Sequence, residues 1–386
     1  TWDSRINGGI DLMAKKIKVK KTNKKKRKIS YINVIRRITG RIYLWLENLL
    51  KPNWVTRLRI KKGKLDIPLE LVKMNRIMNW WYKRPELKIS DAKPLEHVTF
   101  KTKDDLNISG VIYRGNPNSK KWVVACHWFG GHKYWALYNT IMFRKMGYNV
   151  LAIDFRGHGE SDNDLTSMGA REVYDVMSAI QYLNDKEKVD QIALYGISMG
   201  AFSISYLSVM DPEFCHKNKV KFGICDSAYE SIFTLLHHVR DKHLIVIPKR
   251  KARQQIIKIM EHHNRLETNP DIDWFATSVI TKIKLEHKKP AFPILFMHAQ
   301  NDKVTNPIDS YRVFAERAKL IEGDDIWTFK YGTHALMTKE HFKEVERHIG
   351  EYIAVMDDNN IQYEAAESEL QLTVKDKRDQ KEDSLL

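Results

Sequence analysis

Hydrophobic and polar positions follow two different patterns after residue 95. Residues 96–102 (EHVTFKT) and 108–115 (ISGVIYRG) alternate in polarity around a polar turn, which predicts an antiparallel β-hairpin. The stretches that follow are unbroken apolar runs, which are typical of strands buried on both faces of a sheet. These runs are WVVACHW (122–128), YNVLAIDF (148–155), QIALYGI (191–197), VKFGICDS (220–227), AFPILFMHA (291–299) and IWTFK (326–330).

Helical stretches separate these apolar runs and are expected at 136–146, 170–184, 199–209, 307–320 and 340–355. Buried strands joined by helices predict an α/β fold, with a mostly parallel central sheet and helices on both faces. One interval interrupts the rhythm, because the residues between Asp226 and Pro290 show helical and basic stretches but no strand pattern. We therefore expect a helical lid insertion, at about residues 229–289, over the carboxyl edge of the sheet.

Two further helices are predicted before the hairpin. Within residues 31–50, apolar side chains recur every three or four positions with arginines between them, which predicts an amphipathic helix. Arginine costs about 2.5–3.5 kcal/mol at the centre of a bilayer, so this helix is a poor spanning segment. A second helical stretch covers residues 69–83 and ends before a proline. We assign residues 31–95 to a helical N-terminal extension, residues 96–356 to the main domain, and residues 357–386 to a flexible charged tail.

The positive charge of the chain is concentrated at its N-terminus. The formal net charge is +17, and residues 1–64 carry 20 Lys or Arg against three acidic residues, while the rest of the chain carries 45 of each sign. Residues 15–28 hold ten of these cations and have little to bury, so residues 1–30 should form a disordered basic arm. Because Met13 resembles a translation start, residues 1–12 are interpreted as a leader.

The basic arm and the amphipathic helix together predict contact with a membrane surface. Anionic lipid attracts each lysine by about 1 kcal/mol near the surface, and the helix could lie in the interface with Trp45. We expect residues 15–50 to bind an anionic membrane surface, with the protein cytoplasmic and peripheral on the inner face of the cell membrane. The alternative is a solvated tail beside a helix that packs on the main domain. The arm lacks the aromatic interleaving of an RNA-binding surface, so no nucleic acid partner is expected.

The cysteines and histidines indicate neither disulfides nor metal sites. Cys126, Cys215 and Cys225 lack a paired spacing and lie in or beside apolar runs, which predicts buried free thiols in a reducing compartment. His262 and His263 have no ligand spacing with carboxylates and are interpreted as solvated helix surface. We therefore expect no metal ion and no cofactor.

The strongest chemical signal is the pentapeptide Gly196-Ile197-Ser198-Met199-Gly200, which directly follows a strand pattern and precedes a helix pattern. A serine hydroxyl is a weak nucleophile, and a sharp strand-to-helix turn exposes it for reaction. Glycines two positions on either side leave room for the tight backbone. The helix N-terminus behind the serine favours developing negative charge. This context indicates that Ser198 is a nucleophile.

Five segments, in order along the chain, resemble the α/β-hydrolase superfamily. They are CHWFGG (126–131), DFRGHGES (154–161), YGISMGA (195–201), HAQNDKVT (298–305) and YGTHA (331–335). Residues 96–356 are most similar to the bacterial serine hydrolases of the esterase, lipase and serine-aminopeptidase-like group, here with a basic N-terminal extension. The resemblance implies the α/β-hydrolase fold.

The resemblance also implies a Ser-His-Asp triad. Ser198 would attack the substrate carbonyl, His334 would take and return the serine proton, and Asp302 would hold the histidine in the right tautomer. The chain order Ser, Asp, His is that of this fold. Asp226, at the end of the fourth apolar run, is the alternative acid. Three further residues are expected to fix loops rather than to react: Asp154, His158 and His127.

The implied oxyanion hole consists of two backbone N–H groups, those of Met199 and Phe129. Each such donor is worth about 2.7–4 kcal/mol in the transition state. The sequence departs from the family at Trp128, where glycine is usual. If this position needs a positive φ, tryptophan would be strained there, and Gly130 and Gly131 would supply the conformational freedom.

Together these features predict a serine hydrolase that cleaves a small-molecule acyl ester, with lipid-derived esters among the candidates. A thioesterase or an aminopeptidase-like amidase is the alternative, because the same triad serves all three acyl groups. A catalytically inactive hydrolase fold, kept as a membrane-associated scaffold, is disfavoured because all three triad residues are present. A dehalogenase or an epoxide hydrolase would need an aspartate in place of Ser198.

Overall fold

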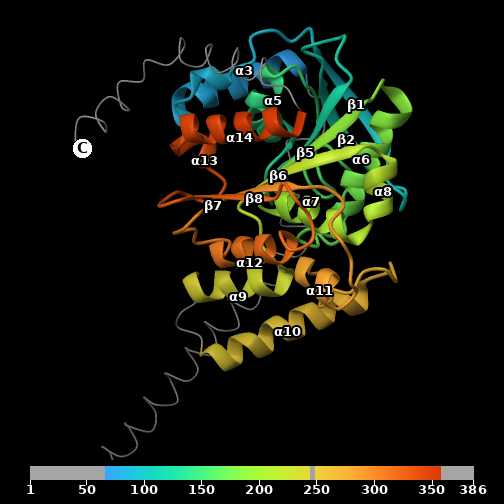
Figure 1. Cartoon of the computed structure of the whole chain (residues 1–386), viewed down its shortest axis with the longest axis vertical. Helices are drawn as coiled ribbons and strands as arrows, with labels where there is room; N and C mark the ends of the chain where they lie inside the picture. Colours follow the sequence, from blue (N-terminus) through green and yellow to red (C-terminus); the bar gives the residue numbers. More distant parts are fainter. Residues whose placement is uncertain (1–65, 244–247, 358–386) are drawn as a thin grey trace, which may run out of the picture. The chain divides into compact units, whose positions relative to one another are not determined.

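The computed structural model describes residues 66–243 and 248–357 of the chain (Figure 1). Three predictions lie outside the described residues: the basic arm at 1–30, the amphipathic helix at 31–50, and the tail from residue 358 onward. Within the described ranges, no helix is both long and apolar enough to cross a membrane.

The centre of the described domain is an eight-stranded sheet with the order β1-β2-β4-β3-β5-β6-β7-β8. β1 and β2 form the expected antiparallel hairpin, β2 is antiparallel to β4, and β3 to β8 run parallel to one another. This topology confirms the predicted mostly parallel α/β sheet. The strands are β1 (Leu95–Lys101), β2 (Asn107–Tyr113), β3 (Lys121–Cys126), β4 (Asn149–Ile153), β5 (Gln191–Ile197), β6 (Val220–Asp226), β7 (Ile294–Ala299) and β8 (Asp325–Phe329).

Both faces of the sheet are buried, as the unbroken apolar runs predict. Along β3, Val123 and Ala125 belong to one hydrophobic core, whereas Val124 and Cys126 belong to the other. Helices cover both faces, as Figure 1 shows. The first core includes residues of α3 (Ile67–Ile77), α4 (Lys133–Asn139), α5 (Ile141–Lys145) and α14 (Phe342–Asp357). The second includes residues of α6 (Glu172–Lys186), α7 (Met199–Met210), α8 (Pro212–Lys217) and α12 (Pro307–Arg317).

Two helices differ in detail from their predictions. The stretch at 136–146 forms two helices, α4 and α5, which are separated at Thr140. The Thr140 hydroxyl donates to the Leu137 carbonyl at 2.7 Å, a side-chain hydrogen bond that competes with the regular helical pattern. The stretch at 69–83 is α3 followed by a π-helical turn, η1 (Met78–Tyr82), after which Lys83 adopts the left-handed conformation.

The segment between β6 and β7 is the expected helical insertion. It contains α9 (Ile232–His243), α10 (Lys249–Leu266) and α11 (Val279–Lys284), and its described residues pair in β fashion at a single isolated bridge, Ser231 with Ser278. The interpretation of His263 as solvated surface is wrong. Its side chain is buried, because the chain after α10 turns back and stacks Trp274 on the His263 ring, with centroids 4.8 Å apart.

Candidate active site

Ser198 lies at the turn between β5 and α7. Its φ of 55° and ψ of −110° are sparsely populated values for any residue other than glycine. Two backbone hydrogen bonds hold it there: the Ser198 N–H donates to the Asp226 carbonyl at 2.8 Å, and the Ser198 carbonyl accepts from the Phe202 N–H at 2.9 Å. The end of β6 and the first turn of α7 therefore fix the strained turn.

Two glycines make this turn sterically possible. A Cβ atom on Gly196 would lie 2.5 Å from the Gly200 carbonyl carbon, and a Cβ atom on Gly200 would lie 2.6 Å from the Cys126 carbonyl oxygen. Side-chain carbons do not approach backbone atoms this closely, so both positions require glycine. The pentapeptide thereby brings the first turn of α7 against the ends of β3 and β5.

Three side chains from distant parts of the chain form a continuous hydrogen-bonded row. Ser198 Oγ lies 2.9 Å from His334 Nε2, and His334 Nδ1 lies 2.7 Å from Asp302 Oδ2. An ionised carboxylate can only accept, so His334 Nδ1 carries the proton and Nε2 of the neutral ring accepts from the serine hydroxyl. Such a row can activate a serine for attack on a carbonyl carbon.

Asp302 is buried and ionised. Burial alone would raise the pKa of its carboxyl group, but hydrogen bonds with His298 and His334 outweigh burial and hold the pKa well below its usual range. The backbone N–H groups of Val304 and Thr305 donate to Asp302 Oδ1 at 2.7 and 3.0 Å. These donors fix the carboxylate with its other oxygen, Oδ2, facing His334.

His298 and Thr305 complete the surroundings of the row, although their side chains were not among the predicted site residues. Thr305 Oγ1 lies 3.1 Å from Asp302 Oδ2 and 3.2 Å from His334 Nδ1. His298 Nε2 lies 3.5 Å from the same carboxylate oxygen, and His298 Nδ1 lies 2.7 Å from Ser310 Oγ. Both residues lie in the same segment as Asp302, HAQNDKVT (298–305), and this shared segment is the sequence signal that could have identified them.

Asp226, the alternative acid, ends β6 in a different environment. Among the described residues, its carboxyl group accepts a hydrogen bond from Ser227 Oγ at 2.8 Å and makes none with His334. Burial raises the pKa of Asp226 to about 6, against the opposing effect of the Ser227 hydrogen bond. The fold thus brings Asp302, and not Asp226, to the histidine.

The expected oxyanion donors lie at the start of α7 and in the loop after β3. Met199 is the first residue of α7, so its N–H has no partner within the helix. Phe129 lies in the loop, beside Trp128. Trp128 does not adopt a positive φ, so a tryptophan is not strained there; Gly130 takes the left-handed conformation instead, with φ 82°. The loop therefore accommodates the departure from glycine at position 128.

Two buried histidines fix this loop. His127 Nδ1 lies 2.6 Å from the Trp128 carbonyl, and His127 Nε2 accepts from the Phe155 N–H at 3.1 Å. His158 Nε2 accepts from the Gly130 N–H at 3.0 Å. Burial lowers the pKa of His127 to about 3, so its ring is neutral and can make one donated and one accepted hydrogen bond.

A buried ion pair anchors the far end of the same loop. Lys133 Nζ lies 2.8 Å from Asp154 Oδ2 and 2.9 Å from Ser109 Oγ, and the Lys133 N–H donates to Asp154 Oδ1 at 2.7 Å. Burial would raise the pKa of Asp154, but the Lys133 ammonium lowers it to about 2. These contacts agree with the loop-fixing roles expected for Asp154, His127 and His158.

The three cysteines are free and buried, as predicted. Burial raises the pKa of Cys126 and Cys225 strongly and that of Cys215 to about 12, so none is a thiolate nucleophile at neutral pH. In the part of the chain that the structure describes, no group of His, Cys, Asp and Glu side chains is arranged to hold a metal ion.

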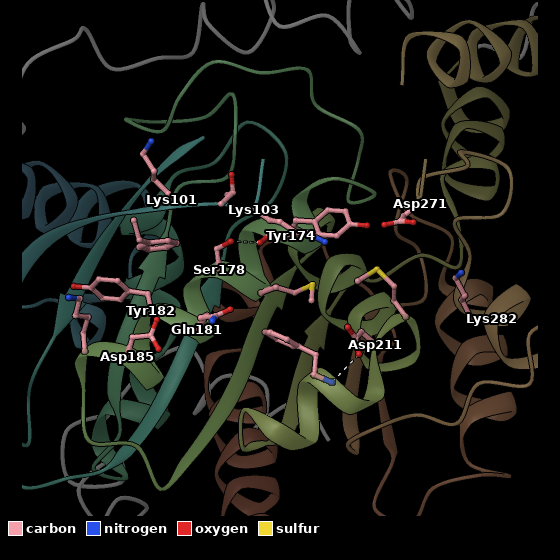
Figure 2. A pocket seen from close by; sticks show the side chains of 16 residues that line it. Lys101, Lys103, Tyr174, Ser178, Gln181, Tyr182, Asp185, Asp211, Asp271 and Lys282 are labelled. Carbon is pink, nitrogen blue, oxygen red and sulfur yellow. Dashed lines mark hydrogen bonds between the residues drawn. The ribbon is translucent and has the colours of Figure 1, made fainter. Parts of the chain in front are cut away.

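A groove of about 880 Å³ lies apart from this site, between α6, α8 and the end of β1 (Figure 2). Its lining includes Tyr174, Ser178 and Asp271, and contains no residue of the row formed by Ser198, His334 and Asp302. The Ser178 hydroxyl donates to the Tyr174 carbonyl of its own helix at 2.8 Å, and no histidine is among the lining residues. The groove therefore offers no activated nucleophile.

The sheet order, the strained serine turn and the helical layers are those of an α/β hydrolase. Residues 117–340, more than half of the chain, match the model of the family described as serine aminopeptidase, S33. The chain belongs to this family, whose members are hydrolases.

Solved structures are similar to this chain at low sequence identity. Two crystal forms of the esterase Pf2001 of Pyrococcus furiosus are 20% and 21% identical to this chain, with TM-scores of 0.50 and 0.51. Each match covers 67% of this chain and 91% or 90% of the esterase. An acylaminoacyl peptidase of Pyrococcus horikoshii is 18% identical, with a TM-score of 0.48, over 67% of this chain and 41% of that one. At such identities the similarity to the esterase concerns the fold alone, and a substrate must be argued from the site.

Proposed function

We propose that this protein is a serine hydrolase that cleaves a carboxylic ester through an acyl-enzyme intermediate. The proposal depends on one observation: Ser198 Oγ, His334 and Asp302 Oδ2 are joined by contacts of 2.9 and 2.7 Å, with the serine on a fixed, strained turn. The coarser assignment to the hydrolases rests on the family.

Acylation begins with attack by Ser198. As Oγ bonds to the ester carbonyl carbon, His334 Nε2 takes the serine proton and the carbonyl oxygen becomes an oxyanion. The N–H groups of Met199 and Phe129 would donate to this oxyanion, each contributing about 2.7–4 kcal/mol. When the tetrahedral intermediate collapses, the alcohol leaves with the proton from Nε2, and the acyl group stays on Ser198.

Deacylation uses the same groups with water as the nucleophile. His334 takes a proton from the water as its oxygen attacks the acyl carbonyl, and Ser198 leaves with that proton, which releases the carboxylic acid. Asp302 keeps the His334 tautomer fixed and stabilises the imidazolium that forms in each half-reaction. Its low pKa keeps the proton on His334.

We assign the insertion at 229–289 the role of a lid that covers the acyl group. One contact ties it to the site: His238 Nε2, in α9, lies 3.1 Å from the Asp302 carbonyl oxygen. A carbonyl can only accept, so this histidine nitrogen carries a proton. The apolar side chains of the stretches at 229–239 and 274–280 would suit an acyl chain, including one derived from a lipid.

Hydrolysis of an amide, as in an aminopeptidase, or of a thioester is the second candidate. The family description names an aminopeptidase, whereas the Pyrococcus furiosus neighbour is described as an esterase. An amide has the poorer leaving group, so protonation by His334 would have to supply more of the barrier lowering than it does for an ester.

Initial rates on one acyl group, presented as an ester, a thioester and an amide, test this choice. We expect the highest kcat/KM for the ester, and for Ser198→Ala we expect a kcat at least about 10,000-fold lower on each of the three substrates. A higher kcat/KM for an aminoacyl amide with a free ammonium than for the matched ester would contradict the esterase proposal and identify the activity as that of an aminopeptidase.

We also propose, from composition alone, that residues 15–50 attract the protein to an anionic membrane surface on the cytoplasmic side. A lipid-derived ester would then be available close to the enzyme.

A further inference from the structure

The outer side of α3 and η1 exposes apolar and cationic side chains together. We call this surface the α3–η1 face; its residues lie three or four positions apart and share one side of the helices. Two of them are among the more exposed large apolar side chains, with Val72 65% and Trp80 79% exposed. The face consists of Leu69, Val72, Lys73, Arg76 and Trp80.

The backbone beneath this face is well anchored. Met78 and Tyr82, on the inner side of η1, are buried in the first core. Lys83 ends the turn in the left-handed conformation, and Arg84 Nε donates to the Lys339 carbonyl at 2.9 Å. A fixed backbone therefore presents Trp80 to solvent.

The charge of the face disfavours two of its potential occupants. Between residues 67 and 82 the only acidic residue is Glu70, which is buried and pairs with Lys73 Nζ at 2.7 Å. The chain before α3 is strongly basic, with 20 Lys or Arg in residues 1–64. The same face of a second copy, or the basic arm itself, would bring like charges beside Arg76. An anionic partner would instead be attracted by Arg76 and by the basic chain before α3.

We propose that the α3–η1 face docks on an anionic lipid bilayer. Tryptophan is favoured at the level of the lipid headgroups, where Trp80 would lie. Leu69 and Val72 would enter the boundary with the acyl chains, and Arg76 would meet lipid phosphates. This surface belongs to the described domain and is distinct from residues 15–50.

Aromatic contacts connect η1, the turn that carries Trp80, with the loops of the candidate active site. Trp81 contacts Trp135 with ring centroids 6.1 Å apart, and Trp135 contacts Trp128, in the loop of the expected oxyanion donor, at 5.4 Å. Lys339 Nζ, five residues after His334, lies 4.1 Å from the Trp81 ring centroid. Docking would place the bilayer beside the rim of the site. Delivery of a lipid ester to Ser198 rests on the proposed function, whereas docking itself does not.

Partitioning of the full chain onto vesicles of phosphatidylcholine and phosphatidylglycerol tests the proposal. At roughly 1 M NaCl the Debye length is about 3 Å, so attraction by the basic arm is screened and apolar insertion remains. We expect Trp80→Ala and Val72→Asp each to lower the partition coefficient by at least about tenfold, and Trp80→Phe to retain most of the binding.

Val355→Asp is the matched control, because Val355 is also a helical valine and is 67% exposed. It lies two residues from Asp357, whose carboxylate contacts Lys121 at the start of β3. Trp81 of η1 instead connects, through Trp135, with Trp128 in the loop after the end of β3. This control should bind vesicles as the wild type does. All variants change exposed side chains, so their thermal unfolding midpoints should match the wild type.

If Trp80→Ala and Val72→Asp partition onto the vesicles as strongly as the wild type does, the proposal is overturned. Complete loss of wild-type binding at high salt would overturn it too, because the basic arm alone would then account for the binding. A wild-type dimer that Trp80→Ala dissociates in sedimentation velocity would identify a second copy as the occupant, and would also overturn it. Hydrolysis of a soluble short-chain ester should be the same in all these proteins, which separates a failure of docking from a failure of the hydrolase mechanism.

Discussion

β6 and β7 are neighbours in the sheet, and a buried aspartate lies at or just after the end of each. Asp226 is the last residue of β6, Asp302 follows β7, and their pKa values shift in opposite directions. At the end of β6, the Asp226 carboxyl group accepts a hydrogen bond from Ser227 Oγ, and burial raises its pKa to about 6. After β7, Asp302 accepts from two backbone N–H groups and faces His298 and His334, which keep its pKa low. Burial is common to both, so the number and charge of the groups that face each carboxyl group decide the direction in which its pKa shifts.

The two aspartates consequently serve the site in different ways. Asp302 meets His334 through its side chain, whereas Asp226 meets Ser198 through its backbone carbonyl, which accepts the Ser198 N–H at 2.8 Å. We infer that β7 supplies the charge that orients the histidine and that β6 supplies the support that holds the serine turn.

Removal of the nucleophile should give the largest effect. We expect Ser198→Ala to lower kcat for a short-chain ester by about 10,000-fold or more, because neither carboxylate can replace the attacking oxygen. Far-UV circular dichroism should remain unchanged. A residual kcat within tenfold of the wild type would show that another residue attacks the ester.

Substituting each aspartate in turn by asparagine tests whether Asp302 or Asp226 orients His334. Asp302→Asn should lower kcat by roughly 1,000- to 10,000-fold, because an amide favours the wrong His334 tautomer and does not stabilise the imidazolium. Asp226→Asn, the matched control, should change kcat by less than about tenfold, since its backbone carbonyl remains. The reverse ranking in steady-state kinetics would assign the orienting acid to β6.

The same two variants should change the pH dependence of stability in opposite directions. The raised pKa of Asp226 means that the folded state binds its proton more tightly, so the wild type loses stability as the pH rises from about 4 to about 6. As the pH rises through that window, the free energy of unfolding of Asp226→Asn should therefore increase, relative to that of the wild type, by up to about 3 kcal/mol.

For Asp302 the sign is reversed. Its lowered pKa contributes stability that is present above about pH 4, the unfolded value, and is lost as the pH falls further. The difference by which the free energy of unfolding of Asp302→Asn falls below that of the wild type should therefore be greatest at neutral pH and should decrease in acid. Urea unfolding at a series of pH values measures both curves, and parallel curves for the two variants would refute the assignment of opposite pKa shifts.

Thr305→Val should give the smallest effect. It removes a hydroxyl that lies 3.1 Å from Asp302 Oδ2 and 3.2 Å from His334 Nδ1, while keeping a similar shape. We expect kcat/KM to fall by about two- to tenfold. With one donor fewer, Asp302 should interact more strongly with protonated His334, so the acid limb of the pH profile should move to higher pH. An unshifted limb would give Thr305 a purely structural role.

Much of this fold could be predicted from the sequence, because strands buried on both faces leave unbroken apolar runs and the serine turn needs glycine at 196 and 200. Features that depend on individual side-chain contacts in the folded chain could not be predicted from the sequence. The break at Thr140 coincides with a side-chain hydrogen bond to the Leu137 carbonyl, and the burial of His263 requires Trp274 to return from the next loop.

In the candidate site too, some features could be predicted from the sequence and others depend on contacts that form only on folding. Ser198, Asp302 and His334 were expected to lie together from their motifs, and the fold brings them within hydrogen-bond distance. The opposite pKa shifts of the two aspartates could not be predicted, because they depend on which donors surround each carboxyl group after folding. The exposure of Trp80 was equally hidden, since an aromatic residue in an apolar cluster more often faces the core.

The most direct test of the central claim is covalent labelling by a fluorophosphonate, followed by mass spectrometry of the modified peptide. An activated serine attacks the phosphorus centre irreversibly, whereas an ordinary hydroxyl, such as that of Ser178 in the groove of Figure 2, does not. We predict one label per wild-type chain, on Ser198, and no label on Ser198→Ala. An unlabelled wild-type protein, or equal labelling of both proteins, would contradict the account.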